Sequence, residues 1–289
     1  MAEPTSVFLG WLFGLPWSAV AALAGPVTAW NAFTLLSYVL AGSAACAWLR
    51  ELALPRAAAL AGGLAFALAP YRVAHSTGHL IGPIAVLLPL ALWTFERGLR
   101  GSRAWWGASA AALAALPLSG QLHLALGAIP FFVLYAAVRS RRGDALVAAG
   151  AAALLAVAGG LAVQAATIPG SIAEGGRSLR AVGFYSADPV DFVAPWMRQG
   201  LEQFVFLGWA TPLLALAGLA LLVRSRRYAL AAVLALAALV PALLALGTNL
   251  PTYELLWRHV PGFGYPRVPG RLMPIAALAI GISRPGTRG

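Results

Sequence analysis

Long uncharged runs separated by short arginine clusters dominate this chain. No Asp, Glu, Lys or Arg occurs in residues 104–138, 204–223 or 228–247. A helix needs about 20 apolar residues, at roughly 1.5 Å each, to cross the hydrocarbon core of a bilayer. Only 10% of the residues are charged, whereas a soluble domain has about 25%. We therefore predict an all-α fold, a polytopic transmembrane helix bundle whose partner is the lipid bilayer.

The predicted bundle is a single integral membrane domain over residues 1–289, with about nine or ten apolar segments and two longer loops. The segments are 7–24, 27–49, 57–71, 80–95, 104–119, 122–138, 145–166, 204–223, 228–247 and 272–283, and the loops are about 167–203 and 248–271.

The arginines divide between alternate junctions. The first group lies mostly in short junctions and holds 13 of the 20 positive residues: Arg50, Arg56, Arg97, Arg100, Arg103, Arg139, Arg141, Arg142, Arg224, Arg226, Arg227, Arg284 and Arg288. The second group lies mostly in the two long loops: Arg72, Arg177, Arg180, Arg198, Arg258, Arg267 and Arg271. Short arginine-rich loops stay in the cytoplasm, so the long loops are predicted to be extracytoplasmic.

Composition narrows the setting further. The formal charge of +11 comes from helix ends rather than from one patch, so we expect no nucleic-acid partner. The absence of lysine, with abundant Ala, Gly and Pro, suggests a GC-rich bacterial genome and hence the bacterial cytoplasmic membrane. Cys46 is the one cysteine, so it cannot form an internal disulfide, and it reads as a small core residue. No signal peptide is visible.

The two ends are less regular than the middle of the chain. Segment 7–24 contains Pro16 and is expected either to span the bilayer or to lie as an interfacial helix. Segment 272–283 is too short to cross comfortably, as if the chain stopped partway through a helix. Small residues such as Gly62, Gly63, Gly159 and Gly160 predict close helix packing.

The first long loop carries two aspartates in the sequence Asp188-Pro189-Val190-Asp191. An Asp followed by Pro is typical of a helix N-cap with Pro at the first helical position. A catalytic or metal-binding role for either Asp, or salt bridges to Arg177 or Arg180, are the alternatives.

The second long loop carries Arg267 and Arg271 on either side of Pro269-Gly270. Two guanidinium groups at a membrane surface can bind a phosphate, because Arg binds phosphate through two parallel hydrogen bonds. The alternative is that these side chains only reach from helix ends to the surface.

Further polar residues are expected at the same end of the bundle. Tyr71, Arg72, His75 and His79 form one cluster, but two His do not define a metal site, and we assign no metal. Gln121 and His123 either hydrogen-bond across helices or line a cavity. No nucleotide-binding motif is present.

Three blocks of sequence resemble bacterial membrane proteins related to the C-type (GT-C) glycosyltransferase superfamily. They are residues 31–80, SLRAVGFYSADPVDFVAP at 178–195 and PGFGYPRVPGRLMPIAALA at 261–279, and they occur in the expected order. The resemblance implies transfer of a sugar from a polyprenyl-phosphate donor at the outer face of the membrane. The residues at matching motif positions, implied to bind lipid phosphate or substrate, are Tyr71, Arg72, Tyr185, Asp188, Asp191, Arg267 and Arg271.

The chain departs from that pattern at its N-terminal end. The resemblance implies an Asp general base in a first outward loop, yet only Glu3 precedes Arg50 among the acidic residues. We therefore expect a fragment, truncated at both ends, whose catalytic residue is unassigned and whose need for a cofactor such as a divalent metal is unknown. The alternatives are a non-catalytic membrane scaffold, or a transporter or flippase of a lipid-linked substrate.

Overall fold

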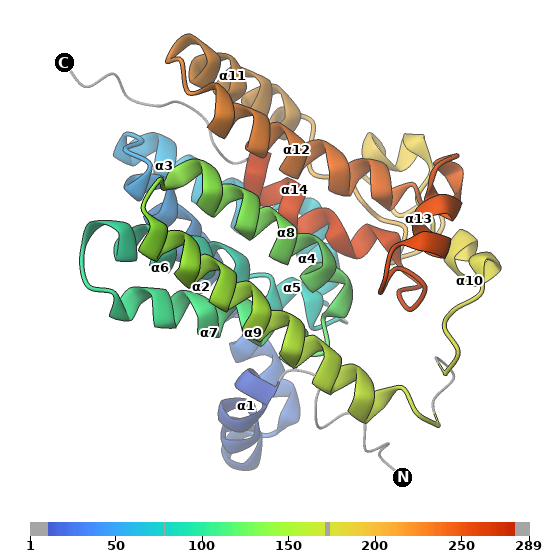
Figure 1. Cartoon of the computed structure of the whole chain (residues 1–289). Helices are drawn as coiled ribbons and strands as arrows, with labels where there is room; N and C mark the ends of the chain where they lie inside the picture. The colour runs from blue at the N-terminus through green and yellow to red at the C-terminus, as the bar shows by residue number, and fades with distance from the viewer. Residues whose placement is uncertain (1–10, 78, 171–173, 281–289) are drawn as a thin grey trace.

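The computed structural model describes residues 11–77, 79–170 and 174–280, and these residues form helices and loops without a strand (Figure 1). The α-helices are α1 (Trp11–Ala24), α2 (Pro26–Glu51), α3 (Arg56–Ala67), α4 (Pro70–Ser76), α5 (Ile81–Ile84), α6 (Leu87–Arg100), α7 (Ala104–Leu118), α8 (Leu122–Arg139), α9 (Gly143–Thr167), α10 (Leu179–Phe184), α11 (Ala210–Arg224), α12 (Tyr228–Ala245), α13 (Tyr253–His259) and α14 (Met273–Ile280). The 3-10 turns are η2 (Pro189–Phe192), η3 (Gly247–Asn249) and η4 (Pro269–Leu272).

Four described helices, α2, α8, α9 and α12, are long and apolar enough to cross a bilayer. The bent pair α3 and α4 adds a fifth if the two helices count as one span, and α7, α11 and η4–α14 are shorter apolar helices. The all-helical prediction is confirmed for the described residues, and these helices are compatible with an integral membrane protein.

Several apolar segments are broken where the sequence places proline or glycine. The segment predicted at 57–71 ends as α3 at Ala67 and resumes as α4 at Pro70 with a bend of 44°. Proline has no N–H to continue the helical ladder and disfavours helical geometry in the preceding residue. The segment predicted from 204 becomes helical only at Ala210, after Gly208 adopts a positive φ of 95°.

Small residues bring α2 and α3 into close contact, as the sequence predicts. A Cβ atom on Gly63 would lie 2.6 Å from the Gly42 carbonyl oxygen and 3.1 Å from the Cys46 Cβ. The two backbones can approach this closely only because glycine has no side chain. Cys46 is half-buried at this contact, consistent with a small packing residue.

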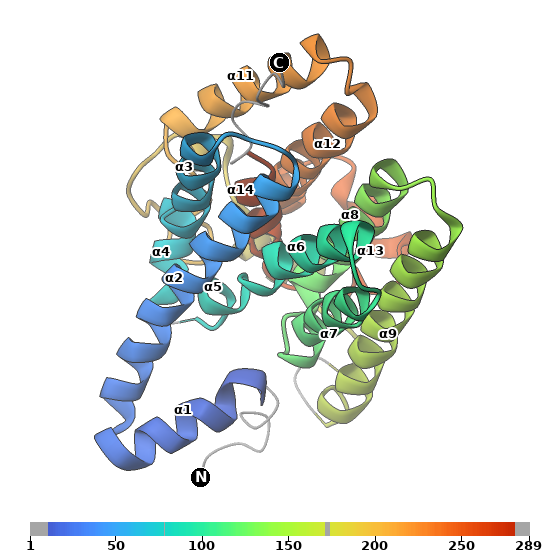
Figure 2. The same ribbon diagram turned by 90° about the vertical axis from the view of Figure 1, so that its left-hand side faces the viewer.

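Helix α14 lies at the centre of the bundle, surrounded by α3, α8, α11 and α12 (Figure 2). All of its residues from Met273 to Ala279 are buried. In contrast, many leucines on the outer sides of α9, α11 and α12, such as Leu154, Leu213 and Leu239, are more than half exposed. A continuous apolar exterior of this kind is expected where lipid surrounds the protein.

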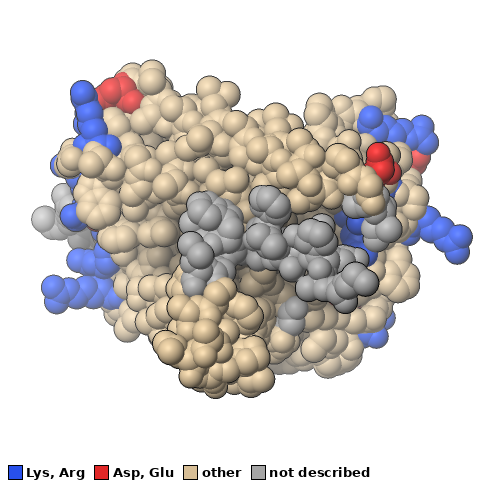
Figure 3. Space-filling view, turned by 90° about the horizontal axis from the view of Figure 1, so that it is seen from below, with Lys and Arg blue, Asp and Glu red and all other residues tan. Residues whose placement is uncertain are grey.

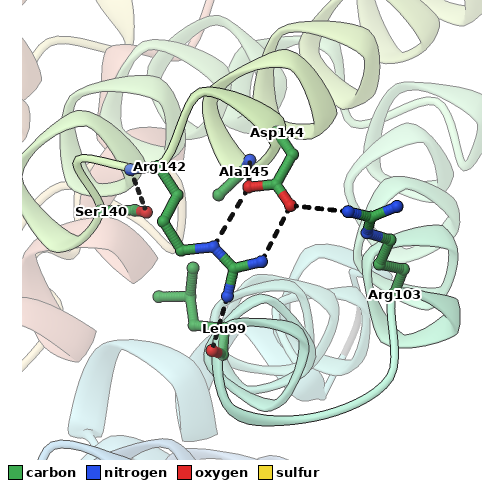
Figure 4. A network of polar contacts seen from close by, with 6 residues as sticks. All are labelled: Leu99, Arg103, Ser140, Arg142, Asp144 and Ala145. Carbon is green, nitrogen blue, oxygen red and sulfur yellow. Dashed lines mark hydrogen bonds and ion pairs between the residues drawn. The ribbon is translucent and has the colours of Figure 1, made fainter.

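On the face in Figure 3 the charged side chains collect at the two ends, and the described surface between them is tan. Polar contacts join the short junctions at one end. Asp144 at the start of α9 binds Arg103 at 3.2 Å and Arg142 at 2.8 Å, and Arg142 also donates to the Leu99 carbonyl oxygen (Figure 4). Arg100 pairs with Glu51 at 2.8 Å. Arg100, Arg103 and Arg142 of the first group thus make contacts between junctions.

A buried polar network joins α2, α6 and α8 near that same end. The Glu96 carboxylate, 1% exposed, accepts hydrogen bonds from Tyr135 Oη at 2.6 Å and from Arg139 Nε and Nη2 at 2.6 and 2.8 Å. Trp48 Nε1 donates to Tyr135 Oη at 2.8 Å. Because every carboxylate contact comes from another helix, the network fixes how the three helices sit against one another.

Candidate functional site: an arginine-lined cavity

A cavity of about 290 Å³ lies at the opposite end of the bundle, between the start of α8, the end of α9 and the loop that precedes η4. Figure 1 shows α10 and α13 on the same side of the molecule as the end of α9. The polar residues that line the cavity are Gln121, His123, Gln164, Arg177, Arg267 and Arg271. None of the described lining residues is acidic, and three of them are arginines.

Glycine turns bring the walls of this cavity together. Gly120 has a φ of 75° and follows the end of α7, so that α8 begins at the cavity with Gln121 as its N-cap and His123 in its first turn. Gly176 has a φ of 90°, and a Cβ atom there would lie 3.1 Å from the Gly264 carbonyl oxygen. The adjacent Arg177 N–H donates to that oxygen at 2.7 Å. The two long loops are therefore joined directly beside the cavity.

Two polar atoms of the wall are buried without a hydrogen-bond partner in the described structure, namely Gln121 Oε1 and His123 Nε2. A buried polar atom left unpaired costs about 1–3 kcal/mol. This cost favours a bound polar molecule or water in the cavity. Of the two sequence interpretations for this pair, the structure supports the one in which both residues line a cavity.

Arg271 is held at the cavity by a carboxylate from the first long loop. Its Nη2 lies 2.6 Å from Glu202 Oε1, and its Nε lies 3.4 Å from Glu202 Oε2. His79 Nε2 lies 3.6 Å from Glu202 Oε1. Burial alone would raise the pKa of Glu202, but the hydrogen bond and charge of Arg271, with smaller contributions from His79 and His75, lower this pKa below its ordinary value. Glu202 is thus an anion at neutral pH.

Arg267 reaches the cavity by a different contact. Its guanidinium carbon lies 5.0 Å from the centre of the Tyr185 ring, a cation–π geometry. Within the described part of the chain Arg267 has no carboxylate partner, so its charge is not offset by an ion pair. The structure therefore brings Tyr185 against Arg267, which lines the same cavity as Arg271.

Tyr71 lies behind this cluster rather than on the cavity wall. It is fully buried, its ring stacks on His75 at 4.1 Å between centres, and its N–H donates to the Phe206 carbonyl oxygen at 3.0 Å. Its electrostatic neighbours include Arg271 and Glu202. Tyr71 is therefore near the Glu202–Arg271 pair but does not line the cavity.

Arg72 lies away from the cavity, at the bend between α3 and α4. Its guanidinium is buried, donates to the Ala67 carbonyl oxygen at 2.8 Å and to the Ser37 carbonyl oxygen at 2.9 Å, and lies 4.8 Å from the centre of the Tyr38 ring. These contacts satisfy a carbonyl left free where α3 ends. In this structure the Arg72 side chain braces the bend and does not line the cavity.

Asp188 and Asp191 form the helix start that the sequence predicts. Asp188 is the N-cap of η2, Pro189 is its first residue, and the Asp188 N–H donates to Asp191 Oδ2 at 2.8 Å in a capping box. The ion-pair partner of Asp191 is Arg198, at 3.1 Å, rather than the Arg177 or Arg180 that the sequence suggested. Both aspartates are thus engaged in local structure.

Glu202, Gln164 and Arg177 belong to the site although the sequence motifs did not single them out. Of these three residues, only Glu202 has a feature that the sequence could have revealed. It is one of only 9 acidic residues, and it lies in the first long loop, whereas the second long loop is rich in arginine. Among the described residues no group of three or more His, Cys, Asp or Glu side chains is arranged to hold a metal ion.

Comparison of the chain with protein-family models, curated proteins and solved structures finds no match. The resemblance to the C-type glycosyltransferase superfamily therefore stays a prediction from the sequence blocks.

Proposed function

We propose that this protein is a membrane protein that binds a phosphate-bearing substrate in the arginine-lined cavity. The observation that carries the proposal is the convergence of Arg177, Arg267 and Arg271 on one cavity without an acidic lining residue among those described. Guanidinium groups bind phosphate through two parallel hydrogen bonds, and a phosphate that replaces water there would meet several donors at once.

We further propose that the substrate is a sugar linked to a polyprenyl phosphate, and that the cavity faces the outer side of the bacterial cytoplasmic membrane. Three features support this reading. They are the order of the three sequence blocks, the asymmetry of the arginines between junctions, and the place of Arg267 and Arg271 within the third block.

In such a transfer the bond between the sugar C1 and the phosphate oxygen breaks, and the acceptor oxygen bonds to C1. The phosphate leaves with increased negative charge, which Arg267 and Arg271 would stabilise. The acceptor proton must pass to a base, for which the described residues offer no assignment. Our proposal for this chain therefore concerns binding of the donor phosphate.

Retention of a polyprenyl phosphate by the purified protein in detergent tests the binding step. We expect Arg267→Ala combined with Arg271→Ala to weaken binding by at least about tenfold, since a hydrogen bond to a charged group contributes roughly 1.5–3 kcal/mol. Arg258→Ala is the matched control, because Arg258 is an exposed loop arginine paired with Glu254 and does not line the cavity.

Binding that is equal in the double variant and the control would refute the cavity as the phosphate site and would favour the scaffold alternative. Inorganic phosphate, tested beside the lipid, distinguishes a site for the phosphate group alone from one that also needs the lipid chain. A sugar-transfer assay with a labelled polyprenyl-phosphate sugar then tests the enzymatic part of the proposal.

A further inference from the structure

One carboxylate, Glu202, is shared between a cavity arginine and a histidine. Arg271 Nη2 and His79 Nε2 lie 2.6 and 3.6 Å from the same oxygen, Oε1. The Glu202 side chain is 13% exposed, whereas that of His79 is 34% exposed. A largely buried anion therefore stands between the phosphate cavity and a histidine that solvent can reach.

The pairing divides the two edges of the Arg271 guanidinium. The Nε–Nη2 edge faces Glu202, and the described residues provide no hydrogen-bond partner for Nη1. The guanidinium is planar and rigid, so fixing one edge also fixes the direction of the remaining N–H groups. Since Arg271 lines the cavity, Glu202 orients the donor that a bound anion would meet.

The same pairing weakens the attraction of the cavity for anions, because the Glu202 charge offsets the charge of Arg271. Any change that neutralises Glu202 frees more of the Arg271 field for the ligand. Histidine is the side chain that ordinarily changes charge between about pH 5 and 8. A proton on His79 would place a positive charge 3.6 Å from Glu202.

The other titratable groups around Glu202 and the cavity are few. His75 and Tyr71 face Glu202 from α4, and His123 lines the cavity from α8. His75 is completely buried, stacked on Tyr71, and its Nδ1 lies 2.9 Å from the Tyr71 carbonyl oxygen. Charging His75 would bury a cation without a carboxylate in contact, which is costly. His79 is thus the accessible histidine in direct reach of the carboxylate.

We propose that Glu202 is a positioning residue for Arg271, and that protonation of His79 strengthens anion binding in the cavity as the pH falls. The inference rests on the proposed phosphate-binding function and adds its regulation. By linkage, a bound anion also favours the protonated form of His79.

Sulfate is the appropriate probe, because its charge does not change over the range in which histidine titrates. We expect the purified wild-type protein to bind sulfate about fivefold or more tightly at ~pH 5.5 than at ~pH 8, as measured by equilibrium dialysis. His79→Gln is expected to bind with the same affinity at both pH values. Glu202→Gln keeps an acceptor for Arg271 and is expected to bind tightly at both.

Two further variants complete the test. His123→Gln separates the two histidines, because His123 lines the cavity itself. The inference expects this variant to keep the pH dependence, and loss of the pH dependence would assign it to His123 and overturn the role of His79. Glu254→Gln is the matched control for Glu202→Gln, because it also removes a carboxylate from an arginine pair at an exposed site outside the cavity. Size-exclusion chromatography of each variant verifies that the protein remains folded.

The outcomes separate this inference from the proposed function. If the double variant of Arg267 and Arg271 loses sulfate binding, but sulfate binding by the wild-type protein does not depend on pH, the cavity binds anions and the role of His79 is refuted. The inference is also overturned if His79→Gln keeps the pH dependence, or if Glu202→Gln binds more weakly than wild type at pH 8. If neither arginine affects sulfate binding, the proposed function itself fails.

Discussion

The buried pair of Glu96 and Arg139 offers a sharp test of how the helices are held. The Glu96 carboxylate receives three hydrogen bonds, from Tyr135 and from two nitrogens of Arg139, and is 1% exposed. In Glu96→Gln the amide can still accept from Tyr135, but its NH₂ group faces Arg139 donors and the guanidinium loses its counter-charge.

Removing one partner of a buried ion pair costs about 3–5 kcal/mol. The Arg139 side chain is 26% exposed, so water offsets part of its loss, and we take about 3 kcal/mol as the expected destabilisation. At roughly 2–4 °C per kcal/mol for a chain of this size, the unfolding temperature should fall by roughly 6–12 °C.

The half-buried Cys46 supplies the assay, because it is the one cysteine and lies where α2 contacts α3. A thiol-reactive fluorescent dye reports its exposure as the bundle opens on heating. Glu254→Gln serves as the control, since it breaks an exposed pair within α13 and exposed pairs contribute only about 0.2–1 kcal/mol.

Replacing both partners by leucine should recover only part of the lost stability. No unpaired buried charge remains, but the buried Tyr135 hydroxyl loses its acceptor, which costs about 1–3 kcal/mol. If Glu96→Gln unfolds at the same temperature as Glu254→Gln, the network does not hold α2, α6 and α8 together. If the double leucine variant is less stable than Glu96→Gln by more than the roughly 1–3 kcal/mol expected for the unpaired Tyr135 hydroxyl, the charged pair itself supplies the stability, contrary to the reasoning.

Two further predictions concern packing and topology. Gly63→Ala should lower stability by about 1–3 kcal/mol, because the new Cβ would lie 2.6 Å from a backbone oxygen. The control Gly107→Ala, with open space around the position, should be neutral or stabilising by up to ~1 kcal/mol. Equal thermal stability of the two variants, measured by light scattering, would contradict the close contact. In a Cys46→Ala background, an impermeant maleimide added to intact cells should label Phe184→Cys, which is 70% exposed at the end of α10, and should spare Arg226→Cys, and the reverse pattern would invert the proposed orientation.

The spacing of the charged residues and the residues that form turns predicted much of the fold. The uncharged run 104–138 predicted two helices, and Gly120 divides them into α7 and α8. The Asp188–Asp191 sequence predicted the η2 helix start, because that structure depends on neighbours within four residues. Local structures of this kind can be predicted from neighbouring residues, without knowledge of contacts to distant segments.

Contacts between distant segments could not be predicted from the sequence in the same way. The motif resemblance implied that Arg72 binds lipid phosphate or substrate, yet its hydrogen bonds go to the Ser37 and Ala67 carbonyl groups. Glu202 gave no motif, and its role depends on Arg271 and His79, which lie far away along the chain. Only the packing of distant segments decides which arginine faces a cavity and which donates its hydrogen bonds to backbone carbonyl groups.

The backbone hydrogen bond between Arg177 and Gly264, which joins the two long loops, forms only late in the synthesis of the chain. The lining residues of the cavity begin at Gly120 and end at Arg271, so its last wall emerges from the ribosome long after the first helices. A nascent chain stalled before Gly262 would already possess most of its helices but would lack part of the proposed anion site, so ligand capture would report that translation of the C-terminal loop is complete.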